Sequence, residues 1–293
     1  MSYPLISIIL CSFNGEKFIE AQLNSLLNQT YPNLEIIISD DASTDATFRL
    51  LKAYERDQRL KLFSQPHNLG QSKNVDFAIK KSLGEFIAFS DQDDVWLPQK
   101  IEKLYSTIGD GHLVYCDSEL IDEKGGRLNK KISELRNMYT GDETTGFVFS
   151  NVVWGHAMLI SKNILPFILP IPSEIPYDIW IAFRAAATGG IKYLDIPLTL
   201  YRQHESATTR TIAVKTQPRS MSRRYADFQK QLHWIKLMRN EERPEKKFFY
   251  DRLFGLYKKK EKGKYVWPLL FFLLKHKKKL FAFTKKKSTS QVI

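Results

Sequence analysis

Three carboxylates lie within four consecutive residues of this sequence. Asp91, Asp93 and Asp94 come directly after the apolar run at residues 86–89. Carboxylates this close together repel one another unless a positive charge lies among them. Two interpretations are open on this tetrad alone. It is either a solvated turn, or a site where a divalent cation, which prefers oxygen ligands, holds a phosphate group at the end of a strand.

The elements that must position these acids alternate regularly. Apolar runs that predict strands alternate with segments whose apolar residues have helical spacing. Because the runs are apolar on both faces, they are typical of a parallel sheet covered by helices on both sides. The predicted strands are residues 5–11, 34–39, 60–64, 84–90 and 112–120.

Polar residues gather where these strands end. Ser12 and Asn14 follow the first strand, Asp41 follows the second, and the acids at 91–94 follow the fourth. Ligands in such sheets bind beyond the carboxyl ends of the strands. Solvated turns placed at random would spread over both edges of the sheet. The concentration of polar groups at one edge therefore favours a ligand site.

After the fifth strand the alternation ends. Residues 129–150 are polar and predict a loop over the site, and residues 152–160 predict a further strand. Residues 176–190 predict a helix that ends at two glycines. Residues 191–204 predict two short strands around Pro197.

The glycine-rich phosphate loops of many nucleotide-binding proteins are absent from the sequence. A dinucleotide fold needs a Gly-x-Gly-x-x-Gly turn after its first strand, whereas the turn here, SFNGEKF, has one glycine. No Walker-type Gly-x-x-x-x-Gly-Lys occurs either. We therefore expect the carboxylates to hold a diphosphate indirectly, through a metal ion.

Four segments in this order, ISIILCSFNGEKFI, SDDASTD, NLGQSKN and FSDQDDVWLP, resemble the donor half of the family 2 glycosyltransferases, which have the GT-A fold. PYDIWIA and LYRQHESA resemble acceptor-side motifs of the rhamnosyltransferase-like branch. The resemblance implies an α/β GT-A domain over residues 1–210, with a mostly parallel central sheet and helices on both faces. Residues 1–118 would bind the nucleotide-sugar and 119–210 the acceptor. Residues 211–293 would form a helical, basic C-terminal region.

The resemblance also implies roles for single residues on the donor side. Asp41 would accept a hydrogen bond from the nucleotide base, and Asp91 and Asp93 would hold the ribose and a Mn²⁺ or Mg²⁺ bound to the diphosphate. His204 would approach the metal from the far side. The remaining donor-binding residues implied by the resemblance are Ser12, Asn14, Lys73 and Arg202.

On the acceptor side, the resemblance implies that Asp178 is the catalytic base. In an inverting transfer the acceptor hydroxyl loses its proton on the face of the sugar opposite the leaving group, so the base must come from a different segment than the metal pair. Trp154 and Trp180 are candidates for stacking on acceptor sugars. Structural roles are open for each of these residues: Asp41 and Asp178 as helix caps, His204 as a surface histidine, and the tryptophans as core residues.

Two positions depart from the family pattern. The family commonly has Gly where this chain has Ala42, and often His before the base where this chain has Tyr177. The second departure bears on the assignment of rhamnose, because residues beside the base face the donor sugar or the acceptor.

The net charge of +12 lies in the C-terminal tail. Residues 243–293 carry 16 Lys and Arg against 3 Asp and Glu. The block WPLLFFLL within this tail is too short for the roughly 20 residues that span a bilayer. Basic residues around a short apolar block are typical of a segment in the headgroup region. Nucleic-acid binding is the competing interpretation, but the apolar residues come in blocks and not as spaced stacking platforms, so we expect no nucleic-acid partner.

Other features of the sequence fit a cytoplasmic protein that is peripheral on the inner face of the membrane. Cys11 and Cys116 lie in apolar runs, which predicts buried thiols and no disulfide framework. The N-terminal apolar run lacks a preceding basic region and predicts a strand rather than a signal peptide.

The expected function is therefore an inverting, metal-dependent glycosyltransferase of bacterial surface polysaccharide biosynthesis. From the resemblance, dTDP-rhamnose is the first expected donor and a UDP-hexose the second. The expected acceptor is a glycan, lipid-linked at the membrane. The alternative is a non-catalytic module with the same fold that binds sugar-nucleotides or glycans.

Overall fold

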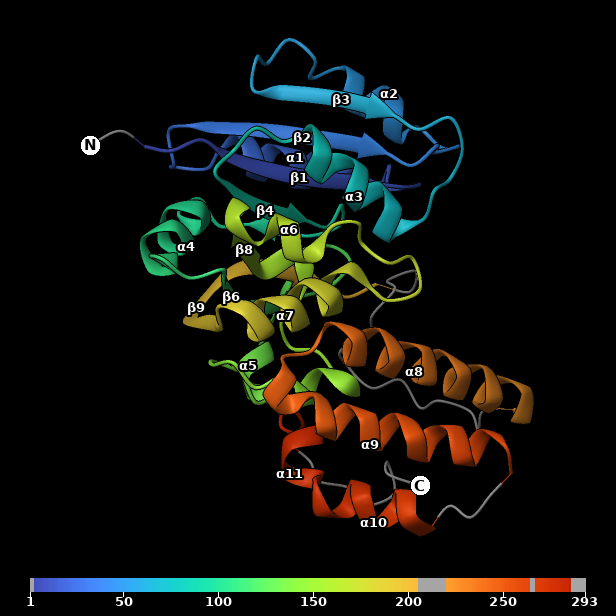
Figure 1. The fold of residues 1–293 in the computed structure, drawn as a ribbon. Helices are drawn as coiled ribbons and strands as arrows, with labels where there is room; N and C mark the ends of the chain where they lie inside the picture. Colours follow the sequence, from blue (N-terminus) through green and yellow to red (C-terminus); the bar gives the residue numbers. More distant parts are fainter. Residues whose placement is uncertain (1–2, 205–219, 264–266, 286–293) are drawn as a thin grey trace.

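The computed structural model describes residues 3–204, 220–263 and 267–285 (Figure 1). Its centre is one nine-stranded sheet in the order β3-β2-β1-β4-β8-β6-β9-β5, with β7 paired to β6. The boundary expected near residue 210 lies outside the described residues. The hydrophobic core extends without a break from the sheet into the C-terminal helices.

The first half of the chain confirms the predicted alternation of strands and helices. Four parallel strands form one side of the sheet; β1, β2 and β4 are largely buried on both faces, whereas the edge strand β3 is only partly buried. They are β1 (Ile6–Ser12), β2 (Leu34–Asp40), β3 (Leu60–Ser64) and β4 (Phe86–Ser90). The helices are α1 (Ile19–Leu27), α2 (Thr47–Lys52), α3 (Gln71–Lys81) and α4 (Lys100–Ile108).

The chain runs outward from β1 to β3 and then returns to place β4 on the other side of β1. Where the connections that follow two adjacent parallel strands run to opposite sides of the sheet, they leave a crevice beyond the carboxyl ends of those strands, and ligands bind in this crevice. The segments after β1 and β4 meet at this crevice. This topology positions Ser12 beside the acids that follow Ser90.

The second half of the sheet is mixed. β6 (Leu113–Ile121) and β4 do not pair directly, because the antiparallel strand β8 (Met158–Ser161) lies between them. The strand expected at 152–160 begins only at Met158, since a 3₁₀ turn, η2 (Gly155–Ala157), precedes it. Short strands β5 (Val95–Trp96) and β7 (Arg127–Lys131) add antiparallel pairs.

The two strands expected around Pro197 are one strand, β9 (Ile191–Arg202). β9 pairs in parallel with β6, and the register shifts on both sides of Asp117. Proline lacks the N–H that a ladder needs, and it is tolerated where pairing is interrupted by a bulge. The shift at Asp117, which pairs with Pro197, explains why the strand continues through the proline.

The loop expected at 129–150 is instead partly ordered into secondary structure. It contains the end of β7, α5 (Ile132–Leu135) and η1 (Thr145–Val148). Phe147 and Val148 are fully buried and anchor it. Tertiary packing against the C-terminal helices supplies the order that its polar sequence did not indicate.

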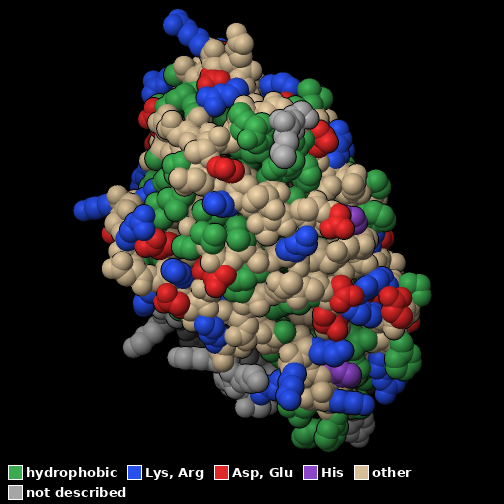
Figure 2. Space-filling view, turned by 90° about the vertical axis from the view of Figure 1, so that its left-hand side faces the viewer, with side chains coloured by type: hydrophobic (Ala, Val, Ile, Leu, Met, Phe, Trp, Pro, Cys, Tyr) green, Lys and Arg blue, Asp and Glu red, His purple; other side chains and the backbone are tan. Residues whose placement is uncertain are grey.

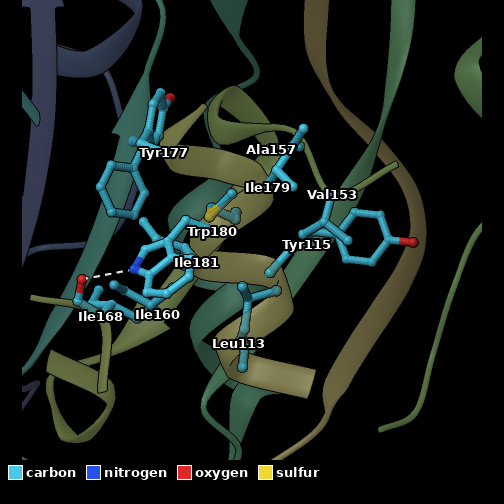
Figure 3. Close-up of a cluster of buried hydrophobic side chains, with 14 of the residues drawn as sticks. Leu113, Tyr115, Val153, Ala157, Ile160, Ile168, Tyr177, Ile179, Trp180 and Ile181 are labelled. Atoms are coloured by element: carbon cyan, nitrogen blue, oxygen red, sulfur yellow. Dashed lines mark hydrogen bonds between the residues drawn. The ribbon is translucent and has the colours of Figure 1, made fainter. Parts of the chain in front are cut away.

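Helix α7 (Tyr177–Thr188) packs against the sheet, following η3 (Lys162–Ile164) and α6 (Leu165–Ile168). Figure 3 shows Ile179, Trp180 and Ile181 of α7 in one cluster of buried side chains with the sheet residues Leu113 and Ile160. Ten of the twelve residues of α7 are buried, so this helix is the core element of the second half.

Four helices form the C-terminal region below the α/β part in Figure 1: α8 (Met221–Glu241), α9 (Pro244–Glu261), α10 (Trp267–Lys275) and α11 (Lys277–Leu280). Leu232 and Ile235 of α8 are buried, whereas Met221 and Tyr225 of the same helix are exposed. No helix of the described ranges combines the length and the hydropathy needed to cross a bilayer.

Candidate active site

The segments after β1 and β2 hold each other in place. Ser12 Oγ donates a hydrogen bond to Asp40 Oδ1 at 2.9 Å. Asn14 has a positive φ of 48°, and its Oδ1 accepts the Thr44 N–H at 2.8 Å. Ser43 N–H donates to Asp40 Oδ2 at 2.9 Å. Ser12 and Asn14, both predicted to bind the donor, therefore line one rigid pair of turns.

Asp41 organises a third turn at the same edge. Its Oδ1 accepts the Leu69 N–H at 2.7 Å and its Oδ2 accepts the Gly70 N–H at 2.9 Å. It does not cap α2, because the N-cap of that helix is Ala46. Each carboxylate oxygen keeps a second lone pair, so the predicted contact to a nucleotide base stays open. Lys73 is exposed in the first turn of the next helix, α3.

Gln92 joins the ends of β1 and β4 and was not predicted as a site residue. Its Oε1 accepts the Phe13 N–H at 2.8 Å and its Nε2 donates to the Phe13 carbonyl at 3.1 Å. Gly15 leaves space for this side chain, because a Cβ at Gly15 would lie 2.4 Å from Gln92 Oε1. The position of Gln92 between two acids was the signal available in the sequence.

The acids after β4 separate into two groups, each with a histidine. Asp93 Oδ2 lies 2.8 Å from His204 Nε2, so the structure brings together two of the predicted metal ligands. Asp91 Oδ2 and Asp94 Oδ2 each lie 3.6 Å from Nδ1 of His156, a residue that was not predicted. The ligand atoms of Asp91, Asp94 and His156 lie within 4.8 Å of one another.

The acid cluster fits a divalent cation. Asp94 is fully buried, and its Oδ2 has no hydrogen-bond partner among the residues that the structure describes. Burial raises the pKa of Asp94 well above its ordinary value, and the Asp93 and Asp91 carboxylates raise it further. Unpaired buried oxygen and crowded negative charge are relieved by a hard cation, for which carboxylate and imidazole are suitable ligands.

His156 is held in one orientation by its neighbours. Its Nε2 lies 3.0 Å from Ser118 Oγ, which leaves Nδ1 facing the acids. Its ring stacks on Tyr201, with the two ring centroids 4.5 Å apart. His156 was not predicted as a ligand because residues 152–160 were expected to form a strand, in which a single histidine is commonly a core residue.

Lys100 lies fully buried behind the same cluster. Its Nζ donates to Thr199 Oγ1 at 2.8 Å and to the His156 carbonyl, and it lies 3.4 Å from the ring centroid of Trp96. Burial lowers its pKa to about 7. These contacts tie the backbone at His156 to α4 and to β9, so both elements hold the cluster in place.

Arg202 supports the acid cluster from its other side. The Arg202 N–H donates to Asp94 Oδ1 at 3.0 Å, and its Nε donates to the Asp93 carbonyl at 2.7 Å. Its Nη1 donates to the Glu123 carbonyl at 2.9 Å, and the guanidinium lies over the Phe18 ring. These contacts position Asp93 and Asp94, and the predicted contact of Arg202 to the donor stays a prediction.

Asp178 lies in the first turn of α7, with one carboxylate oxygen held by a side chain. Asn151 Nδ2 donates to Asp178 Oδ2 at 2.9 Å, and the Ile179 N–H donates to Oδ1 at 2.8 Å. Burial raises the pKa of Asp178 to about 7, and the nearby Asp91 carboxylate contributes to the rise. The helix N-cap is Pro176, so Asp178 is not the cap residue. A carboxylate with a pKa near 7 is suited to take and release a proton at neutral pH.

Residues 7–167 match the family model described as glycosyl transferase family 2. The chain belongs to glycosyl transferase family 2. This match confirms the predicted enzyme class, a glycosyltransferase, although it does not single out the rhamnosyltransferase-like branch.

Relatives and solved structures agree with this family. An uncharacterized glycosyltransferase of Haemophilus influenzae is 30% identical over 220 residues, which cover 70% of this chain and 68% of that protein. The UDP-Glc:alpha-D-GlcNAc-diphosphoundecaprenol beta-1,3-glucosyltransferase WfgD of Escherichia coli is 37% identical over 183 residues, which cover 61% of this chain and 69% of WfgD. S. aureus TarS 1–349 in complex with UDP-GlcNAc superposes with a TM-score of 0.62 and 18% identity, over 87% of this chain and 72% of that chain. This likeness confirms the predicted GT-A fold.

The two departures from the family pattern have structural consequences here. Ala42 adopts a φ of +62°, a left-handed conformation that glycine adopts without strain. Tyr177 is buried, and its Oη would lie 1.7 Å from a Cβ placed on Gly155. Gly155 is therefore the residue that admits a tyrosine beside the proposed base of this family 2 enzyme.

The two tryptophans predicted to bind the acceptor differ in position. Trp180 is 5% exposed, and its Nε1 donates to the Ile168 carbonyl at 2.9 Å (Figure 3). It is a core residue in this structure, which removes the reason to predict stacking on a sugar. Trp154 is half-buried and parallel to the His156 ring at 6.2 Å, next to the acid cluster. Its acceptor role stays a prediction.

Proposed function

We propose that this chain is an inverting glycosyltransferase that transfers a sugar from a nucleotide-diphospho-sugar to a lipid-linked glycan in bacterial polysaccharide biosynthesis. The observation that carries the proposal is the position of Asp178. Its carboxylate is held by Asn151, has a pKa raised to about 7, and is close enough to Asp91 for the two charges to interact. This arrangement supports a site in which Asp178 would act as the base beside a cluster that would bind the diphosphate.

The donor half would hold the leaving group. Asp93 with His204, and Asp91 and Asp94 with His156, are the residues that would hold Mn²⁺ or Mg²⁺. A bound divalent cation supplies charge neutralisation for the departing nucleoside diphosphate. Arg202 and Lys100 keep these ligands in place through the backbone contacts described above.

Asp178 would carry out the proton transfer. Its ionised carboxylate takes the proton of the acceptor hydroxyl, the oxygen forms a bond to the anomeric carbon, and the bond from that carbon to the diphosphate oxygen breaks. Attack opposite the leaving group inverts the anomeric configuration. Asn151 stabilises the ionised form by donating a hydrogen bond to Oδ2.

A UDP-hexose is the donor that the comparisons support, because the name of WfgD includes UDP-Glc. The first expected donor, dTDP-rhamnose, stays a prediction. The lipid-linked acceptor is supported in the same way, since WfgD acts on a sugar diphosphoundecaprenol. Such an acceptor would place the enzyme at the inner face of the cytoplasmic membrane, through its C-terminal region at residues 211–293.

A thermal-shift panel of UDP, dTDP and GDP, each with and without Mn²⁺, tests the donor site. We expect one nucleotide to raise the melting temperature only when Mn²⁺ is present, and the Asp93→Asn variant to lose this shift. Asp76→Asn, at an acid on α3 that pairs with Lys80, is the control that keeps it. No shift with any nucleotide would contradict the donor site.

A further inference from the structure

The C-terminal helices expose a group of large apolar side chains. Leu269 and Leu273 of α10 are buried against the rest of the region, so only one face of the block WPLLFFLL is exposed to solvent. Its other face carries Phe271, which is 67% exposed, and Trp267, which is 61% exposed. Exposed apolar groups of this size that lie together are uncommon on soluble proteins and mark interaction sites.

A second helix contributes to the same surface. Phe248 of α9 is 80% exposed, and with Phe271 it lines a groove of about 730 Å³ between α9 and α10. We call this groove, with its rim, the α9–α10 face. Its other lining residues include Arg252, Pro268, Lys275 and His276.

The charges of the α9–α10 face are predominantly positive. Its acid, Asp251, is already paired with Arg239, whose Nε lies 2.5 Å from Asp251 Oδ1. Arg252 and Lys275 are exposed beside the aromatic rings. Figure 2 shows hydrophobic side chains next to Lys and Arg at the lower end of the molecule. Burial lowers the pKa of His276, and the positive charges of Lys275 and Lys279 lower it further.

We propose that the α9–α10 face docks on the surface of an anionic lipid bilayer. Aromatic side chains beside cations are the pattern of segments that insert into the headgroup boundary without crossing the bilayer. The cations attract anionic headgroups, and the rings enter the adjoining acyl region. This inference rests on the proposed function, in which the acceptor is anchored in a membrane, and it assigns that contact to one face of the C-terminal region.

Docking through this face would keep the active site attached to the membrane. Phe283, which follows α11, packs on Gly146, where a Cβ would lie 2.7 Å from its ring. Arg243, before α9, forms an ion pair of 3.0 Å with Asp142. These contacts join the docking helices to the segment that leads to Asn151 in the active site.

Co-sedimentation of the full chain with vesicles tests the proposal. The vesicles are phosphatidylglycerol with phosphatidylcholine, or phosphatidylcholine alone. We expect binding to the anionic vesicles only, weakened by added salt. The Phe248→Ser/Phe271→Ser variant should bind at least about tenfold more weakly, because two rings no longer leave water. Arg252→Gln/Lys275→Gln should lose about fivefold for each cation.

Matched controls use exposed residues outside the face. Leu83→Ser removes an apolar side chain that is 64% exposed at the turn before β4, and Lys52→Gln/Arg56→Gln removes two exposed cations, one at the end of α2 and one in the turn that follows it. Both should bind as the unchanged chain does. All the replaced side chains are exposed, so equal melting temperatures are expected across the set.

Two outcomes would overturn the proposal. The first is equal vesicle binding by the Phe248→Ser/Phe271→Ser variant and the unchanged chain. The second is that the α9–α10 face forms an interface between two copies of the chain and binds no vesicles. The second would show as a dimer that this variant converts to monomer, with no vesicle binding by either. Hydrolysis of the nucleotide-sugar without acceptor is measured in parallel and should be the same in all variants. Vesicle binding without turnover would contradict the proposed function and leave the docking face standing.

Discussion

Replacing Asn151 by Ala should shift the pH dependence of catalysis. Asn151 donates the side-chain hydrogen bond that stabilises the ionised form of Asp178, whose pKa burial has already raised to about 7. A hydrogen bond to a charged group contributes about 1.5–3 kcal/mol, and one pKa unit corresponds to 1.36 kcal/mol. Because the Ile179 N–H still donates to Oδ1, we expect the pKa to rise by about one to two units.

The consequence at neutral pH follows from the ionised fraction. With a pKa of about 7, half of the base is ionised at pH 7. A pKa one to two units higher leaves about a tenth to a hundredth, so kcat/KM at pH 7 should fall about five- to fiftyfold and recover at alkaline pH. Asn163→Ala, at an exposed asparagine outside the site, is the matched control and should leave the profile unchanged.

The assay is kcat/KM for nucleotide release in the presence of acceptor, measured from acid to alkaline pH. The role assigned to the Asn151 hydrogen bond would be refuted if Asn151→Ala lowered kcat/KM by the same factor at every pH. An unchanged profile would refute it too, because the hydrogen bond to Asp178 would then have no effect on the ionisation that limits the rate.

Three further substitutions, one of them with a matched control, have defined outcomes. Asp178→Asn should lower kcat about 10²- to 10⁴-fold with the nucleotide-induced thermal shift retained. Because folding raises the pKa of Asp178 from its ordinary value of 3.8 to about 7, the folded chain binds one proton more than the unfolded chain between these pH values. Its stability therefore falls as pH rises from about 4 to about 7 and levels off above 7, so Asp178→Asn should melt increasingly above the unchanged chain over that range. Ala42→Gly should raise the free energy of unfolding by roughly 0.5–1 kcal/mol, because φ is +62°, whereas Ala53→Gly, at a φ of −63°, should lower it in denaturant titrations. Gly155→Ala should destabilise the fold by about 1–3 kcal/mol through collision with Tyr177, measured in the same way; unchanged stability would contradict the contact.

The parallel half of the sheet was predictable because its pattern is local. Each strand from β1 to β4 is a short apolar run followed by polar residues, and each helix has helical spacing, so neither depends on distant contacts. The insertion of β8 between β4 and β6 depends on long-range pairing, which no local pattern encodes. The continuity of β9 through Pro197 likewise depends on the register shift opposite Asp117.

The candidate site was predictable where its residues directly follow strands. Asp91, Asp93 and Asp41 were found because strand ends converge on one edge. His156 and Asn151 were not predicted because they lie in the short connection between η1 and β8, which includes the 3₁₀ turn η2 where the sequence indicated a strand. Lys100 was missed for another reason: a lysine near the start of a helix is ordinarily exposed, and only the tertiary structure shows that it is fully buried.

The central claim is that Asp178 activates an acceptor for inverting transfer from a nucleotide-sugar. The most direct test is the anomeric configuration of the product, measured by NMR after incubation with UDP-glucose, Mn²⁺ and a lipid-diphosphate-linked N-acetylglucosamine, in parallel with dTDP-rhamnose as donor. We predict a product of inverted configuration with one of these donors, and its loss in Asp178→Asn. A product of retained configuration, or equal turnover by Asp178→Asn, would contradict the account.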